Sequence, residues 1–325
     1  MRGKRPYRIV VAEPYAPQAI ARLREVGEVH ILEDSAPQTI LSAIEDCDAL
    51  LVRNKAHVTA RIIDAATNLK VIARASSNVD HIDLRAAGRR NISVVYAPHV
   101  AVTSTAQFAL AMIMTLHRRL PLYDRQLREG HFESLRAPQG RDLGHSTLGI
   151  LGIEPAAEHL ARMCRSAFGT PIIFHDPLER RRIDMPGDEV GLEDLLARSD
   201  ILSVHLPSQP ETKHFLDAAR LATLKQTAVL VNVSRGSVID TTALAQALRR
   251  GQLAGAGLDV FEVEPLPPQH PIRRAPNCIL TPHVAGATLD AADDRYSVAD
   301  DVVRILQGQS PLYSLDMSSA KTPPK

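Results

Sequence analysis

The chain lacks the features that mark membrane, secreted and nucleic-acid-binding proteins. No run approaches the roughly 18 apolar residues that a membrane-spanning helix requires. The opening segment MRGKRPYRIVVAEP has too few apolar residues for a secretory signal. Lys and Arg total 38 against 37 for Asp and Glu, so no charge bias favours nucleic acid or a membrane surface as a partner. We therefore expect a cytoplasmic enzyme or binding protein.

Cysteine is also scarce. Cys47, Cys164 and Cys278 are odd in number and lack the close spacing of a disulfide framework or a metal site. We expect them to be buried free thiols, and we expect no bound metal. The 325 residues are 45% hydrophobic and 23% charged, as in soluble globular proteins, and the length allows two domains.

What the sequence does contain is a regular alternation of β-rich apolar runs and helical patterns, which is typical of βαβ units. The first half has five such runs, at residues 8–14, 29–32, 49–52, 71–75 and 93–98. The second half has six more, at residues 147–153, 171–177, 200–207, 228–234, 254–261 and 278–282. The two series predict two separate parallel sheets.

Two long helical patterns, at residues 101–120 and roughly 287–307, flank the second series. Helices at these places would carry the chain out of the first domain and back into it. We therefore predict a discontinuous first domain, residues 1–98 plus 288–325, and a second domain, residues 99–287, inserted into it.

Three polar side chains in the second half each follow an apolar run: Arg235, Glu264 and His283. In an open parallel sheet such positions share one rim, so these residues are expected to converge on one crevice. A guanidinium, a carboxylate and an imidazole together make an acid–base site with an anion clamp. Reduction of a 2-keto acid needs such a site.

Four stretches carry a resemblance to a known family: LKVIARASSNVDHIDL, ILSVHLPSQPETKHFL, LVNVSRGSVIDTTALAQALRRGQLAGAGLDVFEVEPL and ILTPHVAGAT. They resemble the D-isomer-specific 2-hydroxyacid dehydrogenases, which include phosphoglycerate dehydrogenase, and the match covers nearly the whole chain. The resemblance implies an α/β fold in which a Rossmann dinucleotide-binding domain is inserted into a flavodoxin-like substrate domain. It also implies NAD-dependent interconversion of a D-2-hydroxy acid and its 2-keto acid, by a homodimer built through the Rossmann domain.

The resemblance also assigns roles to the three polar residues. Arg235 would bind the substrate carboxylate and keto oxygen, and His283 would deliver the proton to that oxygen and take it back. Glu264 would hold the imidazole and raise its pKa. Taken singly, each residue is more simply explained as a surface charge, a solvated loop residue or a structural histidine. Their correct spacing inside matching motifs favours catalysis.

The dinucleotide fingerprint G-x-G-x-x-G is broken in this chain. The segment reads Gly152-Ile153-Glu154-Pro155-Ala156-Ala157, so Glu154 stands where a glycine should face the phosphates. Two interpretations stay open. The carboxylate repels the pyrophosphate, at a cost of up to about 4 kcal/mol, or it turns to solvent and caps the helix whose first turn holds Pro155.

Other expected cofactor positions carry suitable residues. Asp176 is placed to accept hydrogen bonds from the adenosine ribose, which favours NAD over NADP. Arg180, Arg181 and Arg182 offer charges for a 2′-phosphate, but beside Asp176 we interpret them as a solvated basic turn. By resemblance the remaining cofactor contacts fall on Pro155, Ala156, His205, Leu206, Pro207, Thr212, Val233, Ser234, Asp259 and Gly286.

The expected substrate loops depart from the family pattern. Family glycines are replaced by Ser76, Ser77, Asn78 and Val79, and His99 replaces a small residue in the next loop. We interpret these changes as an unusual substrate. An alternative from another class stays open, in which a weak or inactive family member acts as a binding or regulatory protein. Glu154 and the altered loops favour that alternative, whereas the intact trio favours the enzyme.

Overall fold

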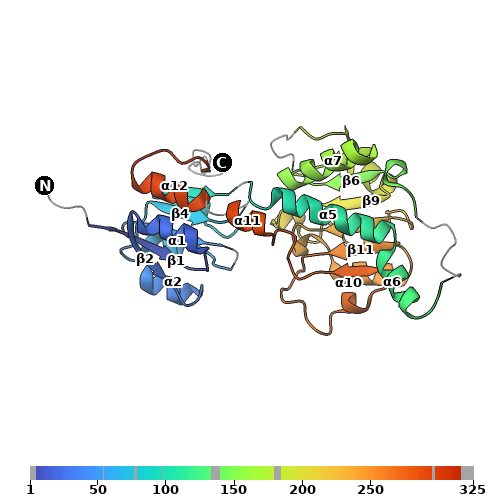
Figure 1. Cartoon of the computed structure of the whole chain (residues 1–325), viewed down its shortest axis with the longest axis horizontal. Helices are drawn as coiled ribbons and strands as arrows, with labels where there is room; N and C mark the ends of the chain where they lie inside the picture. Colours follow the sequence, from blue (N-terminus) through green and yellow to red (C-terminus); the bar gives the residue numbers. More distant parts are fainter. Residues whose placement is uncertain are drawn as a thin grey trace. The chain divides into compact units, whose positions relative to one another are not determined.

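The chain folds into two compact units, and each is described by itself (Figure 1). Unit 1 comprises Met1–Ala101 and Thr288–Lys325, and unit 2 comprises Val102–Ala287. The computed structural model describes residues 5–53, 55–76, 79–97, 99–132, 140–178, 184–294 and 297–315. Five residues singled out in the sequence lie outside these ranges, namely Ser77, Asn78, Arg180, Arg181 and Arg182.

Unit 1 is built on a parallel sheet of five strands in the order β2-β1-β3-β4-β5. The strands are β1 (Tyr7–Val11), β2 (Gly27–Ile31), β3 (Ala49–Val52), β4 (Val71–Arg74) and β5 (Ser93–Tyr96). This order is that of flavodoxin-like sheets, so the predicted fold of this unit is confirmed. Strands β3 and β4 are buried throughout, because helices cover both faces of a parallel sheet.

Alternate side chains of these strands point to opposite faces of the sheet, and each face has its own apolar core. One face packs against α2 (Pro37–Ala43), α3 (Ala60–Ala65) and α4 (Leu84–Arg89). The other packs against α1 (Pro17–Arg24) and α12 (Ser297–Leu306). Helix α12, drawn in red, thus lies beside α1, drawn in blue, although the two are far apart in the sequence (Figure 1). A short helix, α11 (Leu289–Asp294), precedes α12.

Unit 2 is built on a parallel sheet of seven strands in the order β12-β11-β10-β9-β6-β7-β8. The strands are β6 (Leu148–Leu151), β7 (Ile172–His175), β8 (Asp188–Glu189), β9 (Ile201–Val204), β10 (Val229–Asn232), β11 (Gly255–Leu258) and β12 (Cys278–Leu280). Counted within the unit, the order is the Rossmann order 3-2-1-4-5-6 with a seventh strand at the edge, which confirms the predicted fold. The predicted number of six strands is wrong, because β8 consists of two exposed acidic residues and leaves no apolar run to detect.

Helices cover both faces of this sheet as well. Helices α5 (Val102–His117) and α7 (Pro155–Phe168) share one face, and α8 (Leu192–Arg198), α9 (Ala218–Leu221) and α10 (Thr241–Arg249) share the other. Helix α6 (Leu120–Arg128) follows α5 and buries none of its side chains. The strand order reverses between β6 and β9, and such a switch point leaves a crevice beyond the carboxyl ends of the strands.

No helix in the described part of the chain is long and apolar enough to cross a membrane. The three cysteines are free thiols, as predicted, with Cys47 and Cys164 buried and Cys278 partly buried. Burial raises the pKa of each thiol to about 12. The reactive thiolate form is therefore scarce at neutral pH.

Candidate active site

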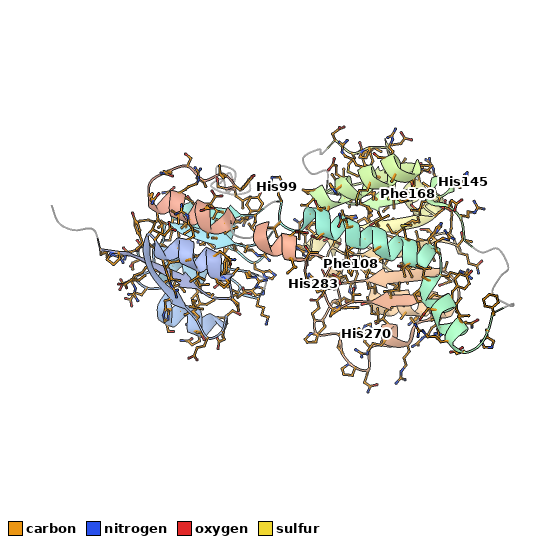
Figure 2. All side chains as sticks on the ribbon, viewed as in Figure 1. His99, Phe108, His145, Phe168, His270 and His283 are labelled. Atoms are coloured by element: carbon orange, nitrogen blue, oxygen red, sulfur yellow. The ribbon has the colours of Figure 1, made fainter. Side chains whose placement is uncertain are left out.

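The three expected catalytic side chains all lie at the carboxyl edge of the unit 2 sheet. Arg235 follows β10, Glu264 follows β11, and His283, labelled in Figure 2, follows β12. Because β10, β11 and β12 are adjacent parallel strands, their ends lie side by side. The sheet therefore brings together three residues that the sequence spreads over about fifty positions.

Glu264 and His283 form a direct hydrogen bond. Nδ1 of His283 donates to Oε2 of Glu264 at 2.8 Å, and the amide of Phe261 donates to the other carboxylate oxygen at 3.0 Å. Both side chains are partly exposed, His283 to 49% and Glu264 to 38%. Within the described residues, no hydrogen bond involves Nε2 of His283. That nitrogen is therefore available as a proton donor or acceptor.

The charges around this pair favour the protonated imidazole. The hydrogen bond from His283 to Glu264 is the main reason that the pKa of His283 is raised, against the opposing effect of burial. Asp259 adds to this rise, whereas the positive charge of Arg235 reduces it. Burial alone would raise the pKa of Glu264, but the bonds from His283 and Phe261 lower it, and so does the charge of Arg235. Arg235 thus lies within electrostatic range of both partners.

Asp259 anchors the loop that carries His283. Its buried carboxylate accepts hydrogen bonds from the Thr281 hydroxyl at 2.6 Å and from the amides of Val284 at 2.9 Å and Ala285 at 2.8 Å. Its backbone carbonyl accepts from the amide of His283 at 2.8 Å. These bonds hold His283 at a φ of 57°, a conformation that residues other than glycine rarely adopt. The sequence contains no local signal for this role.

Asn232 and Gly236 shape the turn that presents Arg235. The buried Asn232 amide donates to the Arg235 carbonyl at 3.0 Å, and its oxygen accepts from the amide of Ser234 at 3.0 Å and from its hydroxyl at 2.9 Å. A Cβ atom on Gly236 would lie 1.9 Å from the carbonyl carbon of Phe261, so only glycine fits there. Sequence reasoning missed Asn232, although a polar residue at the end of an apolar run was a usable signal.

The broken fingerprint still forms a tight turn between β6 and α7. Gly152 has a φ of +92°, and a Cβ atom there would lie 2.7 Å from the carbonyl oxygen of His205. On the other side, the Asp176 carboxylate accepts from the amide of Ile153 at 3.1 Å and from the amide of Leu178 at 3.0 Å. Residues at the ends of β7 and β9 therefore fix this turn from both sides.

Glu154 occupies the N-cap position of α7, but its side chain makes no cap hydrogen bond. The suggestion that this side chain caps the helix is therefore wrong. Its carboxylate instead accepts a hydrogen bond from Nδ1 of His205 at 2.9 Å, because β9 places this histidine next to the turn. The side chain of Glu154 is 35% exposed, whereas that of His205 is completely buried.

The remaining expected cofactor residues lie along the same carboxyl edge. Ala156, Leu206, Thr212, Val233 and Ser234 are buried, Pro155 is exposed, and Pro207 and Gly286 are partly exposed. The Thr212 hydroxyl donates to the Pro207 carbonyl at 2.6 Å and thereby stiffens the loop after β9.

The expected substrate residues belong to unit 1, where they follow the ends of β4 and β5. Ser76 accepts a hydrogen bond at its carbonyl from the amide of Ala97, at 3.0 Å, which ties the two loops together. Val79 packs against the apolar core, and the exposed His99 (Figure 2) contacts the Tyr313 ring edge-on, with 5.2 Å between centroids. Ser76 and His99 therefore border the carboxyl edge of the unit 1 sheet.

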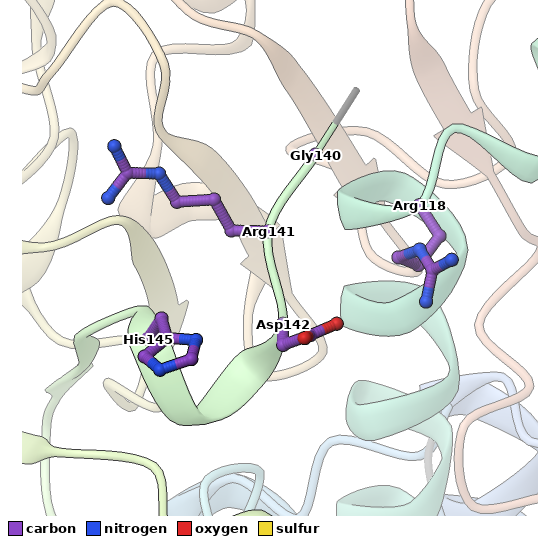
Figure 3. A pocket seen from close by; sticks show the side chains of 5 residues that line it. All are labelled: Arg118, Gly140, Arg141, Asp142 and His145. Carbon is purple, nitrogen blue, oxygen red and sulfur yellow. The ribbon is translucent and has the colours of Figure 1, made fainter. Parts of the chain in front are cut away.

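A separate hollow of about 660 Å³ lies at the opposite edge of the unit 2 sheet, beside the 3₁₀ turn Leu143–His145 that leads into β6. Arg118, Gly140, Arg141, Asp142 and His145 line it (Figure 3). The two arginine side chains extend to opposite sides, and the Asp142 carboxylate points toward Arg118 (Figure 3). These side chains do not point toward a common centre. We therefore place the candidate active site at the carboxyl edge of the sheet and not in this hollow.

Comparison with known proteins agrees with this geometry. The model of the family "D-isomer specific 2-hydroxyacid dehydrogenase, NAD binding domain" matches residues 110–285. The chain is 34% identical to a glyoxylate reductase of Korarchaeum cryptofilum, over 98% of each chain.

Two solved structures with the same overall fold have titles that name a cofactor and a substrate. An NADPH-dependent glyoxylate/hydroxypyruvate reductase of Sinorhizobium meliloti is 29% identical, covering 97% of this chain and 98% of that chain, with a TM-score of 0.83. A D-lactate dehydrogenase of Aquifex aeolicus, complexed with NAD and lactic acid, is 26% identical, covering 93% and 96%, with a TM-score of 0.82. The present chain belongs to the D-isomer-specific 2-hydroxyacid dehydrogenase family and is an NAD-dependent oxidoreductase that interconverts 2-hydroxy and 2-keto acids.

Proposed function

We propose that Arg235, Glu264 and His283 form the catalytic centre for reduction of a 2-keto acid to the D-2-hydroxy acid, and for the reverse reaction. The 2.8 Å hydrogen bond between Glu264 and His283 carries this proposal, because it stabilises the imidazolium needed to protonate the keto oxygen through Nε2. Arg235, within electrostatic range of both, binds the substrate carboxylate through its planar fork of donors.

The turn at Gly152 fits the pyrophosphate of NAD. Its positive φ and its close contact with the His205 carbonyl bring the backbone to the crevice beyond β6 and β9, and α7 begins there. Asp176, at the end of β7, is the residue that we assign to the adenosine ribose. When bound, the nicotinamide supplies the hydride for reduction or accepts it in oxidation. Val233, Ser234 and Gly286, at the ends of β10 and β12, are assigned to the edge of this site.

We further propose that the substrate is a small 2-keto acid of the glyoxylate type. Three relatives, 34%, 37% and 36% identical over nearly their whole lengths, are named glyoxylate reductases. In this proposal, unit 1 is the substrate domain, and the segment Ser76 to Val79 together with His99 contacts the substrate. The changed loop residues then set how large a side chain the keto acid has.

The regulatory alternative rests on Glu154 and on the altered substrate loops. The hydrogen bond of the Glu154 carboxylate to the His205 ring, at 2.9 Å, weakens the first of these two supports. The hydrogen bond between Glu264 and His283 supports an acid–base role for this pair. We therefore retain the dehydrogenase as the single proposed function.

We also propose that the protein is a homodimer in the cytoplasm. Helix α6 presents Leu120 and Leu127, which are 53% and 54% exposed, and none of its side chains is buried within the described part of the chain. An apolar face of this kind suits a second copy of the chain. Light scattering at micromolar concentration tests this proposal, and a monomer that persists at high concentration contradicts it.

The test of the function is a titration with NADH and NADPH, followed by turnover on a panel of 2-keto acids that begins with glyoxylate. We expect micromolar binding of NADH, weaker binding of NADPH, and production of the D-2-hydroxy acid from larger keto acids. Binding of neither dinucleotide would overturn the proposal. Binding without turnover on any keto acid would revive the regulatory alternative.

A further inference from the structure

We propose that His205 is a positioning residue that holds the Glu154 carboxylate away from the pyrophosphate site, so that the pair replaces the missing second glycine of the fingerprint. This inference rests on the proposed use of NAD by the same crevice. It concerns two residues that are 51 positions apart and meet only in the folded chain.

The first observation is that the Glu154 carboxylate does not bond to the amides of its own helix. Three α-helices in the described part of the chain have Asp at the N-cap, and in each the carboxylate accepts a hydrogen bond from its own helix, at 2.8 to 2.9 Å: Asp83, Asp217 and Asp240. Glu154 holds the same position on the 14-residue helix α7 but makes no such bond. Its carboxylate is thus withdrawn from the amides of Ala156 and Ala157.

These two amides are the ones that a phosphate needs. Pro155, in the first turn of α7, has no N–H group, so Ala156 and Ala157 supply the first amides of the helix. The positive end of the helix dipole adds to their attraction for an anion. A capping carboxylate would occupy them, and withdrawal of Glu154 leaves them available to a pyrophosphate.

The second observation is that the imidazole of His205, which holds the Glu154 carboxylate, is itself hydrogen-bonded at both nitrogens. Nδ1–H of His205 donates to Glu154 at 2.9 Å, and Nε2 lies 2.9 Å from the hydroxyl of Ser203, which is buried on β9. A neutral imidazole satisfies both contacts, with Ser203 donating to Nε2. Both ring nitrogens are engaged and the ring is fully buried, so its partners and its packing favour this one orientation.

The third observation is that His205 and the turn are packed as one piece. The backbone of Gly152 lies against the His205 carbonyl, and the amide of His205 donates to the carbonyl of Leu151 at 2.7 Å. This junction between β6 and β9 is the switch point of the sheet. A free carboxylate about 4 Å from the phosphates would weaken binding by up to roughly a thousandfold.

A double-mutant cycle tests this coupling. NADH dissociation constants are measured by NADH fluorescence for wild type, His205→Leu, Glu154→Gly and the double variant. We expect His205→Leu to weaken NADH binding at least tenfold when Glu154 is present and less than about threefold in the Glu154→Gly background. Glu154→Gly alone should improve binding by less than about tenfold, since its carboxylate is already held aside.

If His205→Leu does not fold, Ser203→Ala takes its place in the test. This substitution removes a single hydroxyl, the one that contacts Nε2 of His205. It should weaken NADH binding about threefold, and the effect should vanish in Glu154→Gly. Glu158→Gln is the matched control, since it removes a carboxylate from the first turn of the same helix, where Glu158 pairs with Arg162. It should change the dissociation constant less than twofold, and thermal melts confirm that each variant is folded.

The outcomes separate this inference from the proposed function. Equal losses from His205→Leu with and without Glu154 would show that His205 acts directly on the cofactor or the fold, which overturns the inference and leaves the dehydrogenase intact. Wild type and Glu154→Gly that bind neither NADH nor NADPH would overturn both. A loss that depends on Glu154 supports the positioning role.

Discussion

Two of the imidazole–carboxylate pairs at the carboxyl edge of the unit 2 sheet differ in their burial and in how many ring nitrogens are hydrogen-bonded. In the first, His205 is completely buried and both of its ring nitrogens have partners, Glu154 and Ser203. In the second, His283 is half exposed and only Nδ1 has a partner, Glu264, within the described residues.

The difference teaches that an acid–base role depends on the free nitrogen rather than on the pair itself. A ring with both nitrogens engaged and no access to water holds its neighbours in place, but it has no site at which to exchange a proton. A ring held at Nδ1 is oriented by its carboxylate and still presents Nε2 to a reacting group. Four substitutions test this contrast.

The largest effect is expected from His283→Ala. Loss of the imidazole should reduce kcat for keto acid reduction by about a thousandfold or more, because proton transfer to the keto oxygen is lost. NADH binding should stay within about tenfold of wild type, since the side chain contributes little to holding the cofactor. Near-normal turnover by this variant would show that His283 is not the proton donor.

Arg235→Lys should have the next largest effect. An ammonium keeps the positive charge but loses the bidentate fork that orients the keto acid. We expect KM to rise and kcat to fall together, with kcat/KM reduced about a hundredfold in steady-state assays. A kinetically silent variant would mean that the carboxylate is bound elsewhere, for example by the loop that contains Ser76 or by His99.

Glu264→Gln should shift the pH profile. The carboxylate raises the pKa of His283, so reduction proceeds at full rate below that pKa and slows as the pH rises through it. The neutral amide lowers the pKa of His283, and the falling limb moves to lower pH. We expect about a tenfold loss of kcat near pH 8 and a smaller loss near pH 6, measured as rate against pH for both proteins. An unmoved limb would assign it to another group.

His214→Gln should have the smallest effect. His214 also pairs with a carboxylate, Glu262, at 2.6 Å, and both side chains are partly exposed. This pair has no assigned catalytic role, and exposed pairs contribute at most about 1 kcal/mol of stability. We expect kcat and KM within twofold of wild type, and a melting temperature lower by only a few degrees. A large kinetic loss would show that His214 also contributes to catalysis, which the contrast between the His205 and His283 pairs does not predict.

Much of the fold follows from local pattern. Nine of the twelve described strands contain buried residues, and the alternation with helices implies parallel sheets. The strand that sequence reasoning missed, β8, has only Asp188 and Glu189, so its pairing with β7 depends on the neighbouring strand rather than on its own composition.

The candidate site divides in the same way. Arg235, Glu264 and His283 are each detectable because a charged or polar residue follows an apolar run. Asn232, which holds the Arg235 turn, bonds within its own segment and is detectable as a polar residue that ends an apolar run. Asp259, which anchors the His283 loop, makes contacts that its own segment does not indicate. Asp259 in particular bonds to residues more than twenty positions away, and only the pairing of β11 with β12 brings them into reach.

The sequence by itself determined that the three candidate catalytic residues share one edge, because parallel strands all end on the same side of their sheet. Only the tertiary structure decided what Glu154 does. Its sequence position indicates a repelled phosphate or a helix cap, and neither interpretation includes His205. The order of strands at the switch point puts β9 beside β6, and that long-range arrangement supplies the partner that no local pattern encodes.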